Sequence, residues 1–344
     1  AWENGRKSKI MPEKTIDYRN LAVIGAGAWG TALGAVAALA GRKVTLWARE
    51  SDVVDSINSK HENARFLPGV PLPPAIVATA DMGAAATADA LLISAPAQHL
   101  RDTLAALKPH LAARTPLVLC AKGIEHDTHK LMTEVLIECV PDCEPAILSG
   151  PSFAKDVARN LPTAVTIAAR LDIARALQEA FGHLTFRPYA SDDLTGVALG
   201  GAAKNVYAIA CGIVSGMGLG ESARAALLSR SFAELCRLGE AMGARSETLM
   251  GLSGLGDLVL TATSTSSRNY TFGLDVGKGV SREDLYRPGR PLAEGVATAP
   301  ALVARAHTHK IELPIAQTTA EILAGKIALA DAIPRLMSRP LKTE

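Results

Sequence analysis

LAVIGAGAWGTALGAVAALAGRKVTLW, residues 21–47, is the stretch that decides the fold. The apolar run Leu21–Gly25 predicts a buried strand. The Ala- and Leu-rich run Thr31–Ala40 predicts a helix, which stops at Gly41. Lys43–Trp47 is rich in β-branched and apolar residues and predicts a second strand. A strand, a helix and a strand in this order are typical of the βαβ unit of a parallel sheet.

A GxGxxG motif, formed by Gly25, Gly27 and Gly30, lies between the first strand and the helix. Gly25 permits a tight turn, Gly27 lets backbone N–H groups approach a pyrophosphate, and Gly30 lets helix and strand pack closely. The N-terminus of the helix that follows adds a partial positive charge for phosphates. An ordinary glycine turn is the alternative, but the flanking strand and helix favour a dinucleotide site.

The end of the second strand bears on which dinucleotide binds. Sites that prefer NAD carry an acidic residue there, which binds the ribose 2′-hydroxyl. This chain has Ala48 at that point, followed by Arg49, which can hold a 2′-phosphate, and by Glu50. The sequence therefore favours NADP(H), while Glu50 leaves NAD(H) open. The alternative for Arg49 is a solvated surface arginine.

Strands and helices continue to alternate to about residue 190. Four more apolar runs predict strands: Leu91–Ala95, Leu117–Ala121, Ala146–Gly150 and Thr163–Ala168. From about Leu194 the chain becomes long, apolar and helical, without a convincing strand. We therefore predict an α/β domain with a doubly wound, Rossmann-like parallel sheet, followed by an all-α domain.

The predicted organisation has three parts. Residues 1–19 are polar and charged, lack the apolar segment of a secretory signal, and are predicted to form an extension whose order is left open. Residues 20–195 are predicted to form the dinucleotide-binding domain, and residues 196–340 the helical domain that carries substrate and catalysis. A homodimer through the apolar helical domain is a further expectation.

Bulk composition excludes several classes of function. The 36 basic and 34 acidic residues give a net charge of +2, so there is no long-range field for nucleic acid or an anionic membrane. The five cysteines form no CxxC pair, which favours a reducing, cytoplasmic compartment over a disulfide framework. The eight histidines have no Cys or carboxylate partners at metal-ligand spacing, so we expect no metal site.

Lys204 is the only charged residue between Asp193 and Glu221. The segment Leu194–Gly220 is long enough to raise the question of a membrane span, but its seven glycines, Asn205 and Lys204 favour a buried core helix. Burial of an ammonium group is costly, and it shifts the lysine pKa toward neutrality. Lys204 is therefore a candidate general acid/base; a lysine that reaches solvent past small neighbours is the alternative.

Other residues suit a phosphate-bearing substrate. Ser267, Arg268 and Asn269 are consecutive hydrogen-bond donors, and the Arg side chain can bind a phosphate through two N–H groups. Lys122 follows one predicted strand and Gly150 ends another, at the edge of an open α/β sheet where ligands bind. A solvated loop with serines capping helices is the alternative for the first group.

Six motifs in order resemble the bacterial-type glycerol-3-phosphate dehydrogenase that uses NAD(P)+, over about residues 20–330. They are GAGAWGTALG, CAKGIE (Cys120–Glu125), LSGPSFA (Leu148–Ala154), LGGAAKNVYAIACGI (Leu199–Ile213), GLSGLGDLVLT (Gly251–Thr261) and SSRNYTFG (Ser266–Gly273). The resemblance implies reduction of dihydroxyacetone phosphate, a small phosphorylated three-carbon ketone, to sn-glycerol 3-phosphate for phospholipid synthesis in the cytoplasm.

The resemblance also implies roles for single residues. Lys204 would be the catalytic proton donor and acceptor, and the substrate would contact Lys122, Gly150, Ser152, Lys204, Asp257, Ser267, Arg268 and Asn269. The cofactor would contact Gly25, Gly27, Ala28, Trp29, Gly30, Arg49, Lys122, Ala154, Arg268, Leu292 and Glu294. Ala28 stands where family members often have Ser or Thr, which removes one hydroxyl contact to the pyrophosphate. The segment Arg290–Ala297 matches the family loosely.

Two other functions remain open at this point. A β-hydroxyacid or 6-phosphogluconate-type dehydrogenase also places a lysine and an asparagine on a buried helix. The phosphate-binding residue types of Ser266–Asn269 and the GLGD loop that ends at Asp257 argue against it. A non-catalytic protein that senses NADP would use the same nucleotide domain, yet it has no need of a proton donor such as Lys204.

Overall fold

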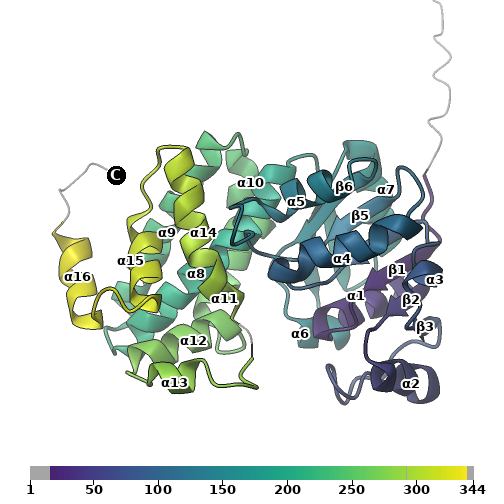
Figure 1. Cartoon of the computed structure of the whole chain (residues 1–344), viewed down its shortest axis with the longest axis horizontal. Coiled ribbons are helices and arrows are strands. Elements are labelled where there is room, and N and C mark those ends of the chain that lie inside the picture. Colours follow the sequence, from purple (N-terminus) through teal and green to yellow (C-terminus); the bar gives the residue numbers. More distant parts are fainter. Residues whose placement is uncertain (1–15, 292, 339–344) are drawn as a thin grey trace, which may run out of the picture.

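An eight-stranded sheet forms the N-terminal half of the molecule (Figure 1). The computed structural model describes residues 16–291 and 293–338. The strands lie in the order β3-β2-β1-β4-β5-β6-β7-β8. Their bounds are β1 Asn20–Ile24, β2 Lys43–Trp47, β3 Ile76–Thr79, β4 Ala90–Ile93, β5 Pro116–Leu119, β6 Glu144–Ser149, β7 Thr163–Ala168 and β8 Phe186–Ser191.

The predicted parallel sheet is confirmed for β1 to β6, which pair with one another in parallel. The prediction was wrong for the direction of β7, which pairs antiparallel with β6. An apolar run such as Thr163–Ala168 indicates a buried strand but carries no information about its direction. β3 and β8, the two edge strands, were not predicted. β3 alternates buried and exposed residues, and β8 contains Pro188, which sheets tolerate at an edge.

Helices cover both faces of the sheet because successive strand residues point to opposite sides. In β1, Val23 belongs to the core formed with α1, α2 and α7, whereas Ile24 belongs to the core formed with α4 and α5. The helices of this half are α1 Ala28–Leu39, α2 Ser51–Lys60, α3 Met82–Ala85, α4 Leu100–Leu107, α5 Met132–Cys139, α6 Ala154–Ala158 and α7 Leu171–Phe181, with the short η1 Ala97–His99 and η2 Lys108–His110.

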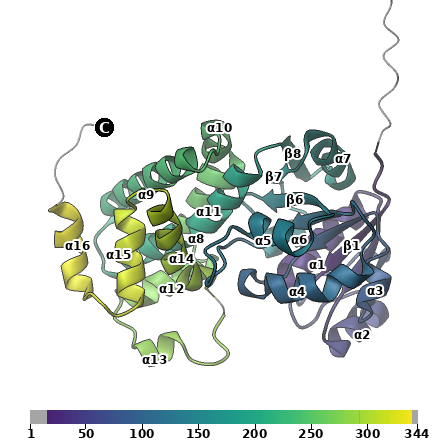
Figure 2. The ribbon, with the colours of Figure 1, turned by 45° about the horizontal axis from the view of Figure 1, so that its top comes forward.

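The C-terminal half is built around one long helix, α8, which spans Leu194–Gly216. It is long and apolar enough to cross a membrane, but 94% of its most apolar 18-residue stretch is buried inside the protein. Figures 1 and 2 show it enclosed by other helices. The remaining helices are α9 Glu221–Ala241, α10 Ser246–Met250, η3 Leu252–Gly256, α11 Asp257–Thr263, α12 Arg268–Gly277, α13 Arg282–Leu285, α14 Glu294–Thr308, α15 Pro314–Leu323 and α16 Leu329–Met337.

Helices α8 and α12 contact each other through their backbones. A Cβ atom on Gly212 would lie 2.2 Å from the Tyr270 carbonyl oxygen, and one on Gly273 would lie 2.1 Å from the Ile209 carbonyl oxygen. Real Cβ atoms do not approach so closely, so glycine is required on both helices. This close packing brings the start of α12 beside the middle of α8, where Lys204 lies.

The division of the chain at residue 195 stays a proposal. Strand β8 ends at Ser191 and α8 begins at Leu194, and α8 contacts β6 and β7 as well as the other helices of its half. At the other end, Tyr18 is buried and Asp17 binds Arg42 at 3.0 Å. These two residues, in the segment we expected to form an extension, therefore pack against the sheet domain.

Candidate active site

The glycine loop, residues 25–30, connects β1 to α1. Gly25 has φ +112, a backbone conformation that side-chain-bearing residues rarely adopt. A Cβ atom on Gly30 would lie 2.0 Å from the Gly25 carbonyl oxygen, whereas one on Gly27 would meet nothing within 4 Å. The loop is thus closed on the protein side and open at Gly27.

Features of this loop suit a dinucleotide. Helix α1 begins at Ala28, and its N-cap residue Gly27 offers no side-chain cap, so the first-turn N–H groups have no capping side chain to satisfy them. The indole Nε1 of Trp29 is buried without a hydrogen-bond partner in the described residues. Open space at Gly27, uncapped N–H groups and an unpaired donor together fit the pyrophosphate of a nicotinamide dinucleotide.

Arg49 stands at the tip of β2, as the sequence suggested. Its side chain is 84% exposed and forms an ion pair with the neighbouring Glu50, at 3.3 Å. Ala48 is buried and carries no acid toward this tip. The structure therefore presents a cation to solvent at the place where a ribose 2′-substituent binds in Rossmann-like folds.

Lys122, Lys204, Asp257 and Thr261 meet where the two halves of the molecule join, and we call them the lysine–carboxylate cluster. The Lys204 Nζ atom donates to Asp257 Oδ1 at 2.5 Å and to Thr261 Oγ1 at 2.9 Å. The Lys122 Nζ atom donates to Asp257 Oδ2 at 2.6 Å and to the Gly150 carbonyl at 3.2 Å. One carboxylate therefore bridges two ammonium groups.

Burial changes the pKa values in this cluster. Lys204 is 7% exposed and Asp257 is 1% exposed. Burial lowers the pKa of Lys204 to about 8, although the adjacent Asp257 carboxylate opposes this shift. Burial alone would raise the pKa of Asp257, but Lys122 and Lys204 hold it below its ordinary value. The cluster thus contains an ionised carboxylate and a lysine that can change protonation near neutral pH.

Asp257 owes its position to an irregular turn of the chain. The segment η3, Leu252–Gly256, is a π-helical turn that leads directly into α11, of which Asp257 is the first residue. A Cβ atom on Gly254 would lie 1.9 Å from the Leu249 carbonyl oxygen, so this turn requires glycine. Thr261 follows four residues later on the same helix face and donates to Asp257 Oδ1 at 3.2 Å.

A chain of amide hydrogen bonds links the cluster to three other segments. Asn205 donates to the Lys122 carbonyl at 3.1 Å, and Asn269 donates to Asn205 Oδ1 at 2.9 Å. The Gly295 N–H in turn donates to Asn269 Oδ1 at 2.9 Å. The amide of Asn269 is therefore engaged on both sides, and only one of its N–H bonds remains for a ligand.

The residues predicted around the SGPSFA segment lie at the end of β6. Gly150 has φ +154, and its carbonyl accepts from Lys122 and, at 3.0 Å, from Ser152 Oγ. Ala154 is the first residue of α6. Gly150 and Ser152 thus adjoin the lysine–carboxylate cluster directly.

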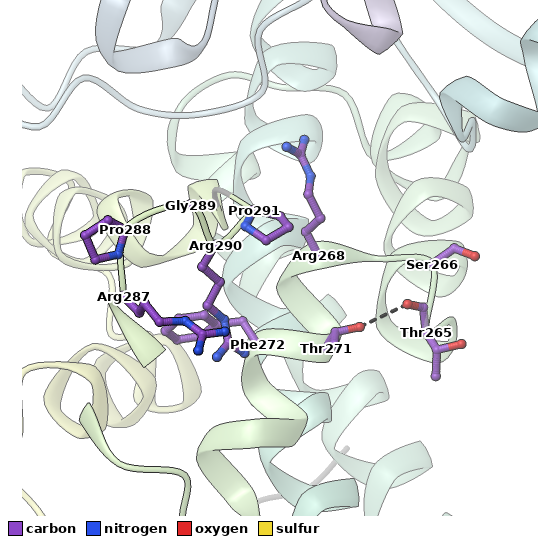
Figure 3. A pocket seen from close by; sticks show the side chains of 10 residues that line it. All are labelled: Thr265, Ser266, Arg268, Thr271, Phe272, Arg287, Pro288, Gly289, Arg290 and Pro291. Atoms are coloured by element: carbon purple, nitrogen blue, oxygen red, sulfur yellow. Dashed lines mark hydrogen bonds between the residues drawn. The ribbon is translucent and has the colours of Figure 1, made fainter. Parts of the chain in front are cut away.

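The predicted phosphate-binding residues lie at the start of α12. Ser267 is buried and caps the helix by accepting from the Tyr270 N–H at 3.2 Å. Arg268 lines a pocket of about 660 Å³, together with Thr265, Ser266, Thr271, Phe272, Arg287, Pro288, Gly289, Arg290 and Pro291. Figure 3 shows the Arg268 side chain pointing away from Phe272. The residues that line this pocket do not include Lys122, Lys204 or Asp257.

Glu294 begins α14, and its carboxylate accepts from the Ala97 N–H at 3.4 Å. Burial raises the pKa of Glu294, and Arg268, Lys204 and Lys122 act against this shift. The N–H of the next residue, Gly295, donates to Asn269, so the start of α14 adjoins the amide chain that leads to the cluster. Leu292, which was predicted beside it, lies outside the described residues.

The structure therefore brings Lys122, Gly150, Ser152, Lys204 and Asp257 together, and it links Asn269 to them through Asn205. Arg49 lies between β2 and α2 and pairs with Glu50, not with this cluster. Thr261 was missed, although its spacing of four residues from Asp257 would have placed both on one helix face. In the described part of the chain, no group of three or more His, Cys, Asp or Glu residues is placed to hold a metal ion.

Comparison with known proteins agrees with this geometry. Residues 20–174 match the profile of the NAD-dependent glycerol-3-phosphate dehydrogenase N-terminus, and residues 193–334 match that of its C-terminus. The protein named glycerol-3-phosphate dehydrogenase (NAD(P)+) in Parvibaculum lavamentivorans is 56% identical over 331 residues, 96% of this chain and 99% of the relative. The protein of that name in Bradyrhizobium sp. (strain ORS 278) is 59% identical over 328 residues, 95% of this chain and 98% of the relative.

A solved structure points the same way. The crystal structure of glycerol-3-phosphate dehydrogenase from Coxiella burnetii superposes with a TM-score of 0.88 at 38% identity, over 94% of this chain and 99% of that one. Ketopantoate reductase from Ralstonia eutropha, at 15% identity and a TM-score of 0.57, shares the fold alone. The chain belongs to the NAD-dependent glycerol-3-phosphate dehydrogenase family.

Proposed function

We propose that this protein catalyses the reversible, NAD(P)H-dependent reduction of dihydroxyacetone phosphate to sn-glycerol 3-phosphate, which supplies phospholipid synthesis. The observation that carries the proposal is the Lys204 ammonium group, which is buried, donates a hydrogen bond to Asp257 and has a pKa of about 8. A ketone needs a proton at its oxygen when hydride reaches its carbon, and an acid whose pKa lies near the working pH serves this best.

Lys204 is the general acid in this mechanism. Its Nζ donates a proton to the ketone oxygen during reduction, and in the reverse direction the neutral amine accepts the proton of the alcohol. Asp257 and Thr261 fix the position of the amine, and the Asp257 carboxylate stabilises its charged form. The bound dinucleotide supplies or accepts the hydride, while the protein positions and polarises the substrate.

Lys122 provides a second cation close to the first. Its Nζ holds the other oxygen of Asp257 and the Gly150 carbonyl, so it can turn to a substrate oxygen without leaving the cluster. Ser152, beside Gly150, adds a hydroxyl donor. Entry of the substrate would thus exchange ion pairs inside the cluster for contacts with the substrate's oxygens.

The substrate phosphate is assigned to the start of α12. Arg268 is exposed there and its guanidinium can bind a phosphate through two N–H groups. The Ser267 hydroxyl, whose oxygen already caps the helix, still has its hydrogen to donate, and Asn269 has one N–H bond left. Arg268 is therefore expected to contribute most of the phosphate affinity.

The cofactor is assigned to the glycine loop, with Gly25, Gly27, Ala28, Trp29 and Gly30 around the pyrophosphate. We also assign Lys122, Ala154, Arg268, Leu292 and Glu294 to the cofactor, as the family resemblance implies, with Leu292 and Glu294 at its nicotinamide end. Arg49 at the tip of β2 supports a preference for NADP(H) over NAD(H), because it offers a cation where an acid would bind a free 2′-hydroxyl.

The cellular setting is part of the proposal. All five cysteines are free thiols in the structure, which suits the reducing cytoplasm. A homodimer through the helical half stays a prediction, and sedimentation of the purified protein would test it.

An absorbance assay of the reduced nicotinamide tests the proposed reaction. Purified protein is expected to oxidise NADPH when dihydroxyacetone phosphate is added, and to oxidise NADH more slowly. Oxidation with hydroxyacid-derived ketones but not with dihydroxyacetone phosphate would favour a hydroxyacid dehydrogenase instead. Tight NADPH binding without oxidation by any small phosphorylated ketone would indicate a sensor.

A further inference from the structure

A buried asparagine outside the glycine loop contacts that loop. Asn63 lies between α2 and β3, in the segment 61–72, and it is wholly buried. Its Nδ2 atom donates to the Ala26 carbonyl at 2.8 Å and to Thr31 Oγ1 at 2.8 Å. Its Oδ1 atom accepts from the Phe66 N–H at 3.1 Å. Both ends of the amide are therefore engaged, and the side chain is fixed in one orientation.

Thr31, on the first turns of α1, completes the contact. Its hydroxyl accepts from Asn63 and donates to the same Ala26 carbonyl at 3.3 Å. Like Asn63, it is wholly buried. The Ala26 carbonyl is thus held on the protein side of the loop by two donors from two different elements.

Ala26 lies between Gly25 and Gly27, so its carbonyl belongs to the peptide unit that leads into Gly27. In a planar trans peptide the C=O and the following N–H point in opposite directions, and no cis bond occurs among the described residues. Holding the Ala26 carbonyl against Asn63 therefore directs the Gly27 N–H to the opposite side. Rotation of this peptide unit would turn a carbonyl oxygen, in place of an N–H, toward that side.

We propose that Asn63 and Thr31 are positioning residues for the cofactor: they hold the Ala26–Gly27 peptide with its N–H directed at the pyrophosphate. The inference rests on the proposed function, because it takes the glycine loop as the dinucleotide site. This peptide rotates easily because Gly27, on one side of it, has no side chain. Its orientation must therefore be imposed by side chains that the GxGxxG motif does not contain.

The consequence is that dinucleotide affinity depends on two side chains that do not touch the dinucleotide. Asn63 and Thr31 act on the ground-state binding of the cofactor, and they lie away from the lysine–carboxylate cluster that carries the chemistry. Their loss should therefore raise the cofactor dissociation constant and KM, and leave kcat at saturating cofactor nearly unchanged.

The test uses two substitutions at Thr31, one without the hydroxyl and one with it, and a truncation at Asn63. Thr31→Val keeps the shape and removes the hydroxyl, whereas Thr31→Ser keeps the hydroxyl. Asn63→Ala removes both the donor and the acceptor. Asn58→Ala is the control, because Asn58 lies on the same crossover and exchanges a similar pair of hydrogen bonds with Ala78 in β3, away from the glycine loop. NADPH affinity is measured by fluorescence titration, and KM and kcat by the absorbance assay.

We expect Asn63→Ala to weaken NADPH binding about tenfold and Thr31→Val several-fold, since each leaves the buried Ala26 carbonyl with one donor fewer. Thr31→Ser and Asn58→Ala should bind within about twofold of wild type. Equal affinity of Thr31→Val and Thr31→Ser would overturn the inference even where Asn63→Ala fails to fold. So would equal losses in Asn58→Ala and Asn63→Ala. Failure of the wild-type protein to bind NADPH would instead overturn the proposed function.

Discussion

The glycine loop and the lysine–carboxylate cluster are built from different parts of the chain. The loop consists of backbone, and its key feature at Gly27 is open space. The cluster consists of side chains from β5's end, α8 and α11, which are buried and paired with one another. The loop is thus ready for its ligand, whereas the cluster must exchange ion pairs to admit one. Cofactor binding and catalysis should therefore respond separately to substitution.

Lys204→Ala should give the largest difference between the effect on catalysis and the effect on cofactor binding. Removal of a general acid typically costs about 10²- to 10⁴-fold in rate, so we expect kcat to fall by about 10³-fold. NADPH affinity should stay within about twofold, because the glycine loop is untouched. Steady-state kinetics and fluorescence titration measure the two effects. Lys60→Ala, at an exposed lysine on α2, is the matched control.

Near-wild-type turnover by a folded Lys204→Ala protein would remove Lys204 from the mechanism. A parallel loss of NADPH affinity would show that the two regions are not independent.

Asp257→Ala should affect folding as well as rate. It leaves the buried Lys204 and the largely buried Lys122 without their shared carboxylate, and loss of one partner of a buried ion pair costs about 3–5 kcal/mol. Denaturant unfolding measures this loss. Asp52→Ala, which breaks an exposed pair with Arg65, should cost about 1 kcal/mol or less. Similar losses in both variants would show that the Asp257 carboxylate is not important for stability.

Two glycines of the loop should separate folding from binding. Gly30→Ala places a Cβ atom 2.0 Å from the Gly25 carbonyl oxygen and should lower the free energy of unfolding by about 1–3 kcal/mol. Gly27→Ala places its Cβ in open space, so unfolding should change little while NADPH affinity falls. Thermal unfolding and fluorescence titration distinguish these outcomes. Unchanged NADPH affinity in Gly27→Ala would show that the cofactor does not bind at this loop.

Arg49→Ala should have the smallest effect, because the arginine is 84% exposed and solvent screens its charge. We expect KM for NADPH to rise several-fold and KM for NADH to stay the same, at low ionic strength. Equal changes in KM for the two cofactors would show that Arg49 is a solvated surface arginine. It would then not account for a preference for NADPH over NADH.

The same contrast explains what the sequence could predict. The glycine loop and β2 were found because strand, turn and helix signals lie within 27 consecutive residues, 21–47. Lys204 was found because it is the only charge in an apolar segment. Thr261 contacts Lys204 across 57 residues, and nothing local to Thr261 marks this contact. Lys122 was found from its position after a predicted strand, and the family resemblance placed Asp257 in the same substrate site.

Other features depend on contacts that no local pattern encodes. The direction of β7 follows from how the chain turns after Gly150, and its own composition does not record it. Asn63 is one of several polar residues in an unremarkable loop, and its role became visible only through its contact with Ala26, 37 residues earlier. Burial of a polar side chain against a motif is a property of the folded chain alone.

The protonation of Lys204 is tested most directly by the pH dependence of kcat/KM in both directions, because kcat/KM reports the pKa of groups in the free enzyme. Reduction needs the ammonium form, which is present below the pKa of about 8 and lost above it, so kcat/KM for dihydroxyacetone phosphate should fall as pH rises through this value. Oxidation of glycerol 3-phosphate needs the neutral amine, so its kcat/KM should rise over the same range. Profiles with opposite slopes and a shared midpoint near pH 8 are the predicted result. Two profiles that are flat between pH 7 and 9, or that move in the same direction, would contradict a general acid/base at Lys204.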